Sequence, residues 1–123
     1  MALATGFGNG IGNTRSLCGC VAGAVLALGT VYGRKNPLER ETPAERVAQL
    51  RGEDGIYAPF QALMEEFTGK FGTAICAELS APLGEFDGKE RKRNCLQLTG
   101  YAARLAVKYA LASREELARW EEA

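Results

Sequence analysis

The residues of this sequence that can do redox or metal chemistry are its four cysteines, Cys18, Cys20, Cys76 and Cys95. The chain contains no histidine. This excludes the usual general base, Cys–His nucleophile pairs, mixed Cys/His zinc sites and histidine-ligated haem. Any chemistry is therefore expected to come from thiols or carboxylates.

Two of the thiols, Cys18 and Cys20, stand at the front of an uncharged run from Ser16 to Gly33. Positions two apart do not share a face of a helix, so in a fully helical segment the two sulfurs would point to nearly opposite sides. Gly19 and the preceding glycine-rich loop indicate that Cys18 lies at a helix N-terminus, where the dipole favours a thiolate. We expect Cys18 to be the reactive sulfur, and Cys20 to be either a second working thiol or a small core residue.

In the segments that must position these thiols, the apolar residues recur at helical spacing throughout. Helices are expected at about 18–32, 43–52, 56–68 and from Asp87 onward, with a helical turn or two within 71–80 and a short last helix from Ser113. Capping boxes predict three of these starts, at Thr42–Glu45, Asp87–Glu90 and Ser113–Glu116. No stretch alternates as a strand does, so the predicted fold is all-α: one helical domain over residues 1–123, a small bundle with a glycine-rich loop before a buried central helix.

Two stripes on these helices matter for the site. The central helix carries a stripe of small residues, Gly19, Gly23 and Ala27, which would let another helix pack very close. The long helix carries its apolar stripe at Cys95, Leu98, Ala102, Leu105 and Tyr109. The start of the central helix, the segment within 71–80 and the long helix thus each direct a thiol towards the interior.

Charge and hydropathy argue against several partners. Fifteen basic and fifteen acidic residues cancel, so neither nucleic acid nor an anionic membrane is an expected partner. The uncharged run just reaches the lower length limit of a membrane span, but its glycines weaken that interpretation and a buried core helix has the same composition. A cytoplasmic location is expected. The basic run Lys89–Arg93 is expected to be a solvated first turn.

The order of motifs resembles a known family. GFGNGIGN, then CGCVAGAVLALGTVYG, then FGTAICAEL, then a cysteine on a long helix, is similar to the redox-active proteins named for their C_GCAxxG_C_C cysteine pattern. Cys18, Gly19 and Gly23 match its motif, and Cys76 and Cys95 match its two later cysteines. Cys20 stands where the motif has alanine. The family's first cysteine lies in a helix upstream of the glycine loop, and we expect this chain to lack that helix, since Met1 comes just before the loop.

The resemblance implies a redox-active protein whose clustered cysteines work as a dithiol/disulfide or as ligands of an iron–sulfur cluster or zinc. The expected working and metal-ligating set is Cys18, Cys76 and Cys95, with Cys20 as a fourth candidate and Gly19 and Gly23 beside any cofactor. No electron donor, acceptor or enzyme class is indicated. The alternative is a non-catalytic helical module whose cysteines are packing residues. A homodimer is expected in either case, because the small-residue stripe would otherwise be partly uncovered.

Overall fold

The structure, a computed structural model, describes residues 2–52 and 55–111. Its elements are η1 (Ala2–Phe7), α1 (Gly19–Tyr32), α2 (Pro43–Arg51), α3 (Tyr57–Phe71), α4 (Cys76–Ser80), η2 (Ala81–Leu83) and α5 (Lys89–Leu111). The described residues form no strand beyond one isolated bridge. The all-α fold class is confirmed, while the helix predicted from Ser113 lies outside the described residues.

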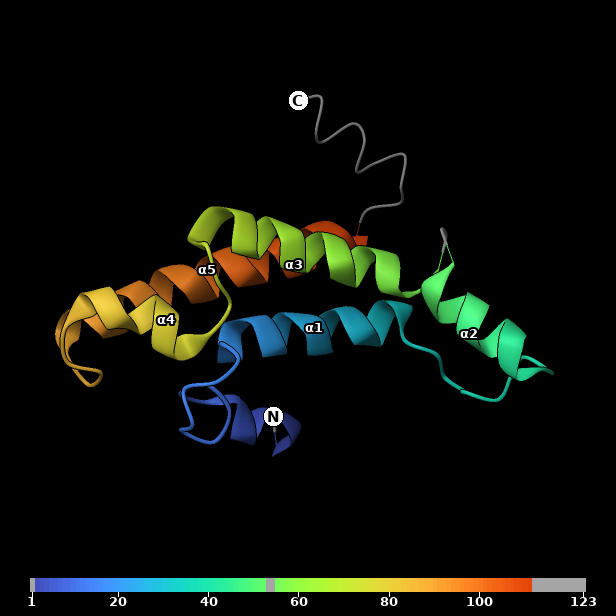
Figure 1. Ribbon diagram of the computed structural model, residues 1–123, viewed down its shortest axis with the longest axis horizontal. Coiled ribbons are helices and arrows are strands. Elements are labelled where there is room, and N and C mark those ends of the chain that lie inside the picture. The colour runs from blue at the N-terminus through green and yellow to red at the C-terminus, as the bar shows by residue number, and fades with distance from the viewer. Residues whose placement is uncertain (1, 53–54, 112–123) are drawn as a thin grey trace, which may run out of the picture.

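Three long helices lie side by side and set the shape of the molecule. α1 and α5 run in the same direction and α3 runs the opposite way, with α2 at one end of the group and α4 at the other (Figure 1). α1 packs most extensively against α5 and also contacts α3 and η1, which is the central position expected for it. Among the described helices, none has both the length and the apolar composition needed to cross a membrane.

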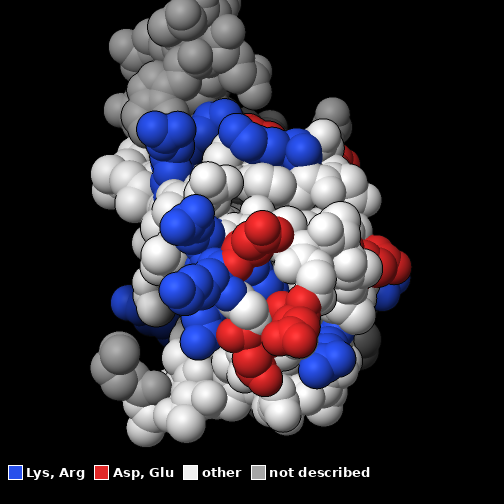
Figure 2. All heavy atoms as spheres, turned by 90° about the vertical axis from the view of Figure 1, so that its left-hand side faces the viewer, with Lys and Arg blue, Asp and Glu red and all other residues white. Residues whose placement is uncertain are grey.

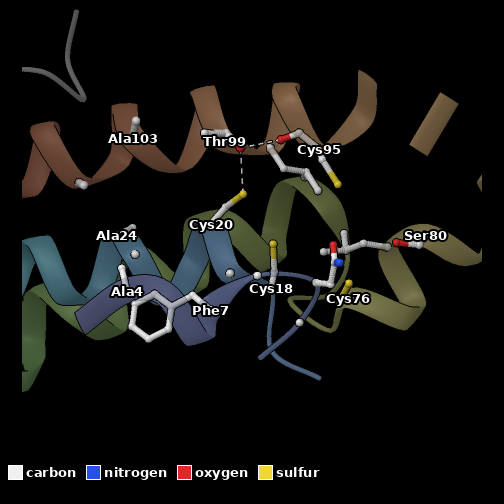
Figure 3. Close-up of a pocket in the computed structure, with 18 of the residues that line it drawn as sticks. Ala4, Phe7, Cys18, Cys20, Ala24, Cys76, Ser80, Cys95, Thr99 and Ala103 are labelled. Carbon is white, nitrogen blue, oxygen red and sulfur yellow. Dashed lines mark hydrogen bonds between the residues drawn. The ribbon is translucent and has the colours of Figure 1, made fainter. Parts of the chain in front are cut away.

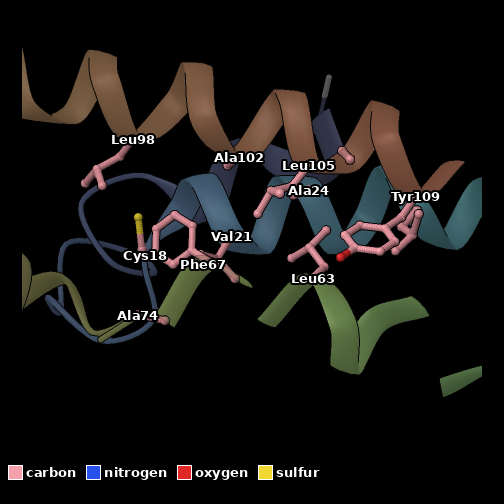
Figure 4. Close-up of a cluster of buried hydrophobic side chains, with 12 residues drawn as sticks. Cys18, Val21, Ala24, Leu63, Phe67, Ala74, Leu98, Ala102, Leu105 and Tyr109 are labelled. Atoms are coloured by element: carbon pink, nitrogen blue, oxygen red, sulfur yellow. The ribbon is translucent and has the colours of Figure 1, made fainter. Parts of the chain in front are cut away.

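The hydrophobic core fills the space between these three helices (Figure 4). Its largest fully buried side chains are Val21, Leu28, Leu63, Phe67 and Leu98. Burying a side chain of this size stabilises the fold by about 1.5–3 kcal/mol. The stripe predicted on α5 is confirmed at Leu98, Ala102, Leu105 and Tyr109, whereas Cys95 is only partly buried.

Two of the predicted capping boxes fall on described helices, and one of the two is confirmed. At α2, Thr42 accepts a hydrogen bond from the Glu45 N–H at 3.1 Å, and the Glu45 carboxylate accepts one from the Thr42 N–H. That capping box is confirmed. The box predicted from Asp87 was wrong, because α5 begins at Lys89 and its first backbone bond runs from Lys92 to the carbonyl of Gly88.

Polar contacts fix the three long helices near the C-terminal end of α1. The hydroxyl of Tyr32 donates to the backbone oxygen of Tyr109 at 2.6 Å. Glu66 of α3 accepts from Lys108 at 2.6 Å and from the hydroxyl of Tyr109. These contacts set the relative positions of α1, α3 and α5. The cysteines lie at the opposite end of α1, which is held in the same group of helices.

Candidate functional site

Cys18 and Cys76 are brought together by the main chain. Cys18 is the N-cap of α1, in extended geometry with φ −56° and ψ 126°. Its N–H donates to the carbonyl of Ala74 at 2.7 Å, and the N–H of Cys76 donates to the carbonyl of Ser16 at 2.6 Å. Together with the antiparallel bridge between Leu17 and Ile75, these bonds hold the start of α1 against the start of α4.

The glycine-rich loop before α1 folds over this junction. Its backbone has positive φ at Gly10 and Gly12, as the glycine pattern predicts, and also at Asn9, Ile11, Asn13 and Arg15. L-residues in this region cost about 1–2 kcal/mol each, and the loop's own backbone bonds offset that cost, among them Ser16 N–H to Gly10 at 2.8 Å. A Cβ at Gly10 would lie 2.6 Å from the Cβ of Cys76. The loop can lie against this cysteine only because residue 10 has no side chain.

Cys20 on α1 is linked to Cys95 on α5 through Thr99. The sulfur of Cys20 is 3.1 Å from the hydroxyl of Thr99, and that hydroxyl donates to the backbone oxygen of Cys95 at 2.7 Å. Figure 3 shows Cys20 pointing from α1 towards Thr99, with Cys18 and Cys95 nearby. Because Cys18 has extended rather than helical geometry, the argument that puts Cys18 and Cys20 on opposite sides does not apply.

All four cysteines line one cavity of about 710 Å³. Its walls come from the glycine-rich loop, the small-residue stripe of α1, α4 and one face of α5. Cys18 and Cys76 are buried, whereas Cys20 and Cys95 are partly exposed. The expectation that the thiols of three segments share one location agrees with this arrangement.

The small-residue stripe borders this cavity, and at Gly19 it also lets η1 pack very close. A Cβ at Gly19 would collide with the backbone oxygen of Phe7, the last residue of η1. Gly23 lines the cavity and a Cβ there would meet nothing within 4 Å. Both glycines predicted beside a cofactor thus lie at the cavity wall.

The two cysteines at the start of α1 have opposite pKa shifts. The interaction between their side chains is the largest cause of both shifts. It raises the pKa of Cys18 far above its usual value, and burial adds to this. It lowers the pKa of Cys20 to about 6 against the opposing effect of burial, with help from the Thr99 hydroxyl. The expectation that Cys18 is the most thiolate-rich residue is therefore reversed.

Cys95 is a partly buried thiol. Burial raises its pKa, and the nearby guanidinium of Arg91 acts in the opposite direction. The charges of Cys18 and Cys76 also raise the pKa of Cys95. With a pKa of about 6, Cys20 is mainly a thiolate at neutral pH, stabilised by its interactions with Cys18 and the Thr99 hydroxyl.

The predicted metal set does not converge on a point. Among residues 2–52 and 55–111, no group of three or more Cys, Asp or Glu residues is arranged to hold a metal ion. The prediction that Cys18, Cys76 and Cys95 would together ligate one ion is not met by this geometry. The thiols are instead spread over the cavity wall.

Sequence reasoning missed Arg91 and Thr99 as parts of the site. Arg91 is 9% exposed and lies in the basic run that was expected to be solvated, so that expectation was wrong at this position. It donates to Asn9 at 3.2 Å and to the sulfur of Cys76 at 3.7 Å. The helical spacing contained the signal, because residues 91, 95 and 99 follow each other four apart and so share one face of α5.

Comparison with known proteins identifies the family of this chain. No curated protein and no solved structure gives a match to this chain. Residues 1–109 match the family described as "Putative redox-active protein (C_GCAxxG_C_C)". The match covers the glycine-rich loop and all four cysteines, so the chain belongs to the C_GCAxxG_C_C family of redox-active proteins.

Proposed function

We propose that the protein carries out redox chemistry at Cys18 and Cys20, which cycle between a dithiol and a disulfide. What supports this is the position of Cys20 beside Cys18 and against the Thr99 hydroxyl, 3.1 Å from its sulfur, which lowers the pKa of Cys20 to about 6. The thiolate, not the thiol, is the nucleophile in thiol–disulfide exchange. Cys20 is also the partly exposed member of the pair, so a substrate can reach it from the cavity.

The proposed reaction has two steps and a disulfide as oxidant. The thiolate of Cys20 attacks one sulfur of the substrate disulfide, forms a mixed disulfide and releases the first substrate thiolate. Cys18 then gives its proton to the released thiolate, attacks the sulfur of Cys20 and releases the second substrate thiolate. The substrate disulfide gains two electrons, and the protein loses two as the Cys18–Cys20 disulfide forms.

The second candidate is an iron–sulfur cluster, and a separate observation favours it. Thiols reach one cavity from the starts of α1 and α4 and from α5, and four thiolates are the usual ligand set of such clusters. A cluster fills the space between its ligands, whereas a single ion needs them to converge. The residues that would hold it are Cys18, Cys20, Cys76 and Cys95. When bound, a cluster would supply one-electron transfer.

A non-catalytic module remains the competing proposal from another class. Its support is that Cys18 and Cys76 are buried, which is common for cysteines that serve only as packing. In that case the small-residue wall of the cavity would serve association into a homodimer. Light scattering at micromolar concentration tests the dimer separately from the thiol chemistry.

One purification separates these proposals. Protein isolated under nitrogen is analysed for iron and acid-labile sulfide, and is then titrated for thiols before and after equilibration with oxidised glutathione. Dithiol chemistry predicts no iron, loss of two thiols and a Cys18–Cys20 linkage in the peptide map.

The matched variants are Cys18→Ser, which should abolish the linkage, and Cys95→Ser, which should not. Stoichiometric iron and sulfide, lost in both variants, would favour the cluster. Four unreactive thiols without iron would overturn both redox proposals.

A further inference from the structure

The cavity is long and differs in polarity between its two ends. Its wall on α5 extends from Arg91 to Val107, roughly 24 Å at the helical rise of 1.5 Å per residue. The end near Arg91 also contains Asn9 and Ser80, whereas the other end is lined by Ala27, Ala103 and other small apolar residues. An amphipathic molecule would match this change from polar to apolar.

Arg91 is a buried cation at the polar end. Its guanidinium stacks on the ring of Phe86 at 3.9 Å and donates to Asn9 and to the sulfur of Cys76. Its Nε is buried and has no hydrogen-bond partner. Within the described ranges the only salt bridge joins Glu66 and Lys108, so no described carboxylate pairs with this arginine. A buried charge without a counter-ion is unfavourable, and an anion in the cavity would remove that cost.

The surroundings of the cavity show that Arg91 is not simply part of a charged surface. Figure 2 shows basic and acidic side chains interspersed over the end of the molecule where α5 begins. Neighbours of Arg91 in sequence, such as Lys92 and Arg93, are exposed there, but Arg91 itself is 9% exposed and lines the cavity. Its charge is directed to the interior, where a planar, bidentate donor suits a carboxylate.

We propose that this cavity binds a small amphiphilic carboxylate, with the carboxylate at Arg91 and the apolar chain along the small residues of α1 and α5. The volume of about 710 Å³ lies within the range of small-molecule sites. Ser80, which is buried at the same end, provides a hydroxyl that can donate to the carboxylate. This site goes beyond the redox proposal and does not depend on it, because it needs neither a thiolate nor a cluster.

The test uses calorimetric titration of the reduced protein with decanoate, decanol and propionate. Decanoate should bind, and decanol and propionate should each bind about tenfold more weakly or worse. The difference arises because decanol lacks the charge that Arg91 recognises and propionate lacks the chain. Equal binding of decanol and decanoate, or no binding of decanoate, would overturn the proposal.

Two pairs of variants locate the ligand. Arg91→Gln should weaken decanoate binding about tenfold or more, whereas its control Arg93→Gln, exposed on the same helix, should leave it unchanged. Ala103→Phe fills the apolar end and should weaken decanoate, while Gln97→Phe, exposed and outside the cavity wall, should not. If Arg91→Gln fails to fold, Ala103→Phe still tests whether decanoate binds in this cavity. Full binding by Ala103→Phe would show that the chain does not lie in this cavity.

Discussion

The thiolate of Cys20 depends on the thiol of Cys18, so replacing Cys18 should change the chemistry of its neighbour. In Cys18→Ala the largest cause of the lowered pKa of Cys20 is removed. The contact with the Thr99 hydroxyl remains and still lowers the pKa, but burial still opposes ionisation. We expect the pKa of Cys20 to rise from about 6 towards the ordinary cysteine value of 9.0.

The size of the effect at neutral pH follows from these two values. With a pKa of about 6, roughly 90% of Cys20 is thiolate at pH 7, and with a pKa of 9 only about 1% is. The more basic thiolate is also intrinsically more nucleophilic, by about 16- to 32-fold for a Brønsted coefficient of 0.4–0.5 over about three units. The two effects nearly cancel, so the alkylation rate at pH 7 should fall only about three- to sixfold. The midpoint of the pH profile, in contrast, should move by up to about three units.

The assay is therefore alkylation of Cys20 by iodoacetamide as a function of pH, followed by peptide mapping. Cys76→Ala is the matched control, because Cys76 is not among the causes of the Cys20 shift, and its midpoint should stay near the wild-type value. An unchanged midpoint in Cys18→Ala would refute the interaction with Cys18 as the source of the thiolate. A wild-type midpoint near 9 would refute the thiolate itself.

Three further predictions concern stability. Between about pH 6 and 9 the unfolded Cys18–Cys20 pair holds one more proton than the folded pair, so the free energy of unfolding of the reduced protein should rise with pH. Above about pH 9 the raised pKa of Cys18 should reverse this slope, so that the free energy of unfolding falls as the pH rises. Urea unfolding at a series of pH values checks both slopes. A variant with alanine at both Cys18 and Cys20 should lack this contribution. Gly10→Ala should destabilise by about 3 kcal/mol or more, from its positive φ and its overlap with Cys76. Gly12→Ala, in open space, should cost only about 1–2 kcal/mol in the same assay. Leu28→Ala, at a fully buried position, should lower the free energy of unfolding by about 2–5 kcal/mol.

The helices could be predicted from the sequence because each depends on local periodicity. The spacing of Val21 and Leu28 requires a helix whichever partner it packs against, and the Thr42 cap requires only the next three residues. The bounds of α1 and the position of α4 were therefore close to the prediction. The start of α5 was wrong by about two residues, because helix ends are decided by backbone geometry that a capping pattern only suggests.

The site could be predicted only in part, because its details depend on contacts between distant segments. That thiols of several helices face one interior region follows from their stripes. The pairing of Cys18 with Cys20 does not, since it requires the extended backbone of Cys18, which the bonds to residues 74–76 impose. The burial of Arg91 likewise depends on the ring of Phe86 and on Asn9, neither of which is within its own helix.

The backbone pairing between the starts of α1 and α4 has a consequence for the proposed thiol chemistry. Many small secreted domains are stabilised by disulfides that close long loops of the chain. Here two short N–H···O bonds, at Cys18 and Cys76, close a comparable loop without any covalent bond. Such a tether keeps its strength in reducing and in oxidising surroundings alike. The sulfurs can therefore change oxidation state while the chain segments that carry them stay fastened together.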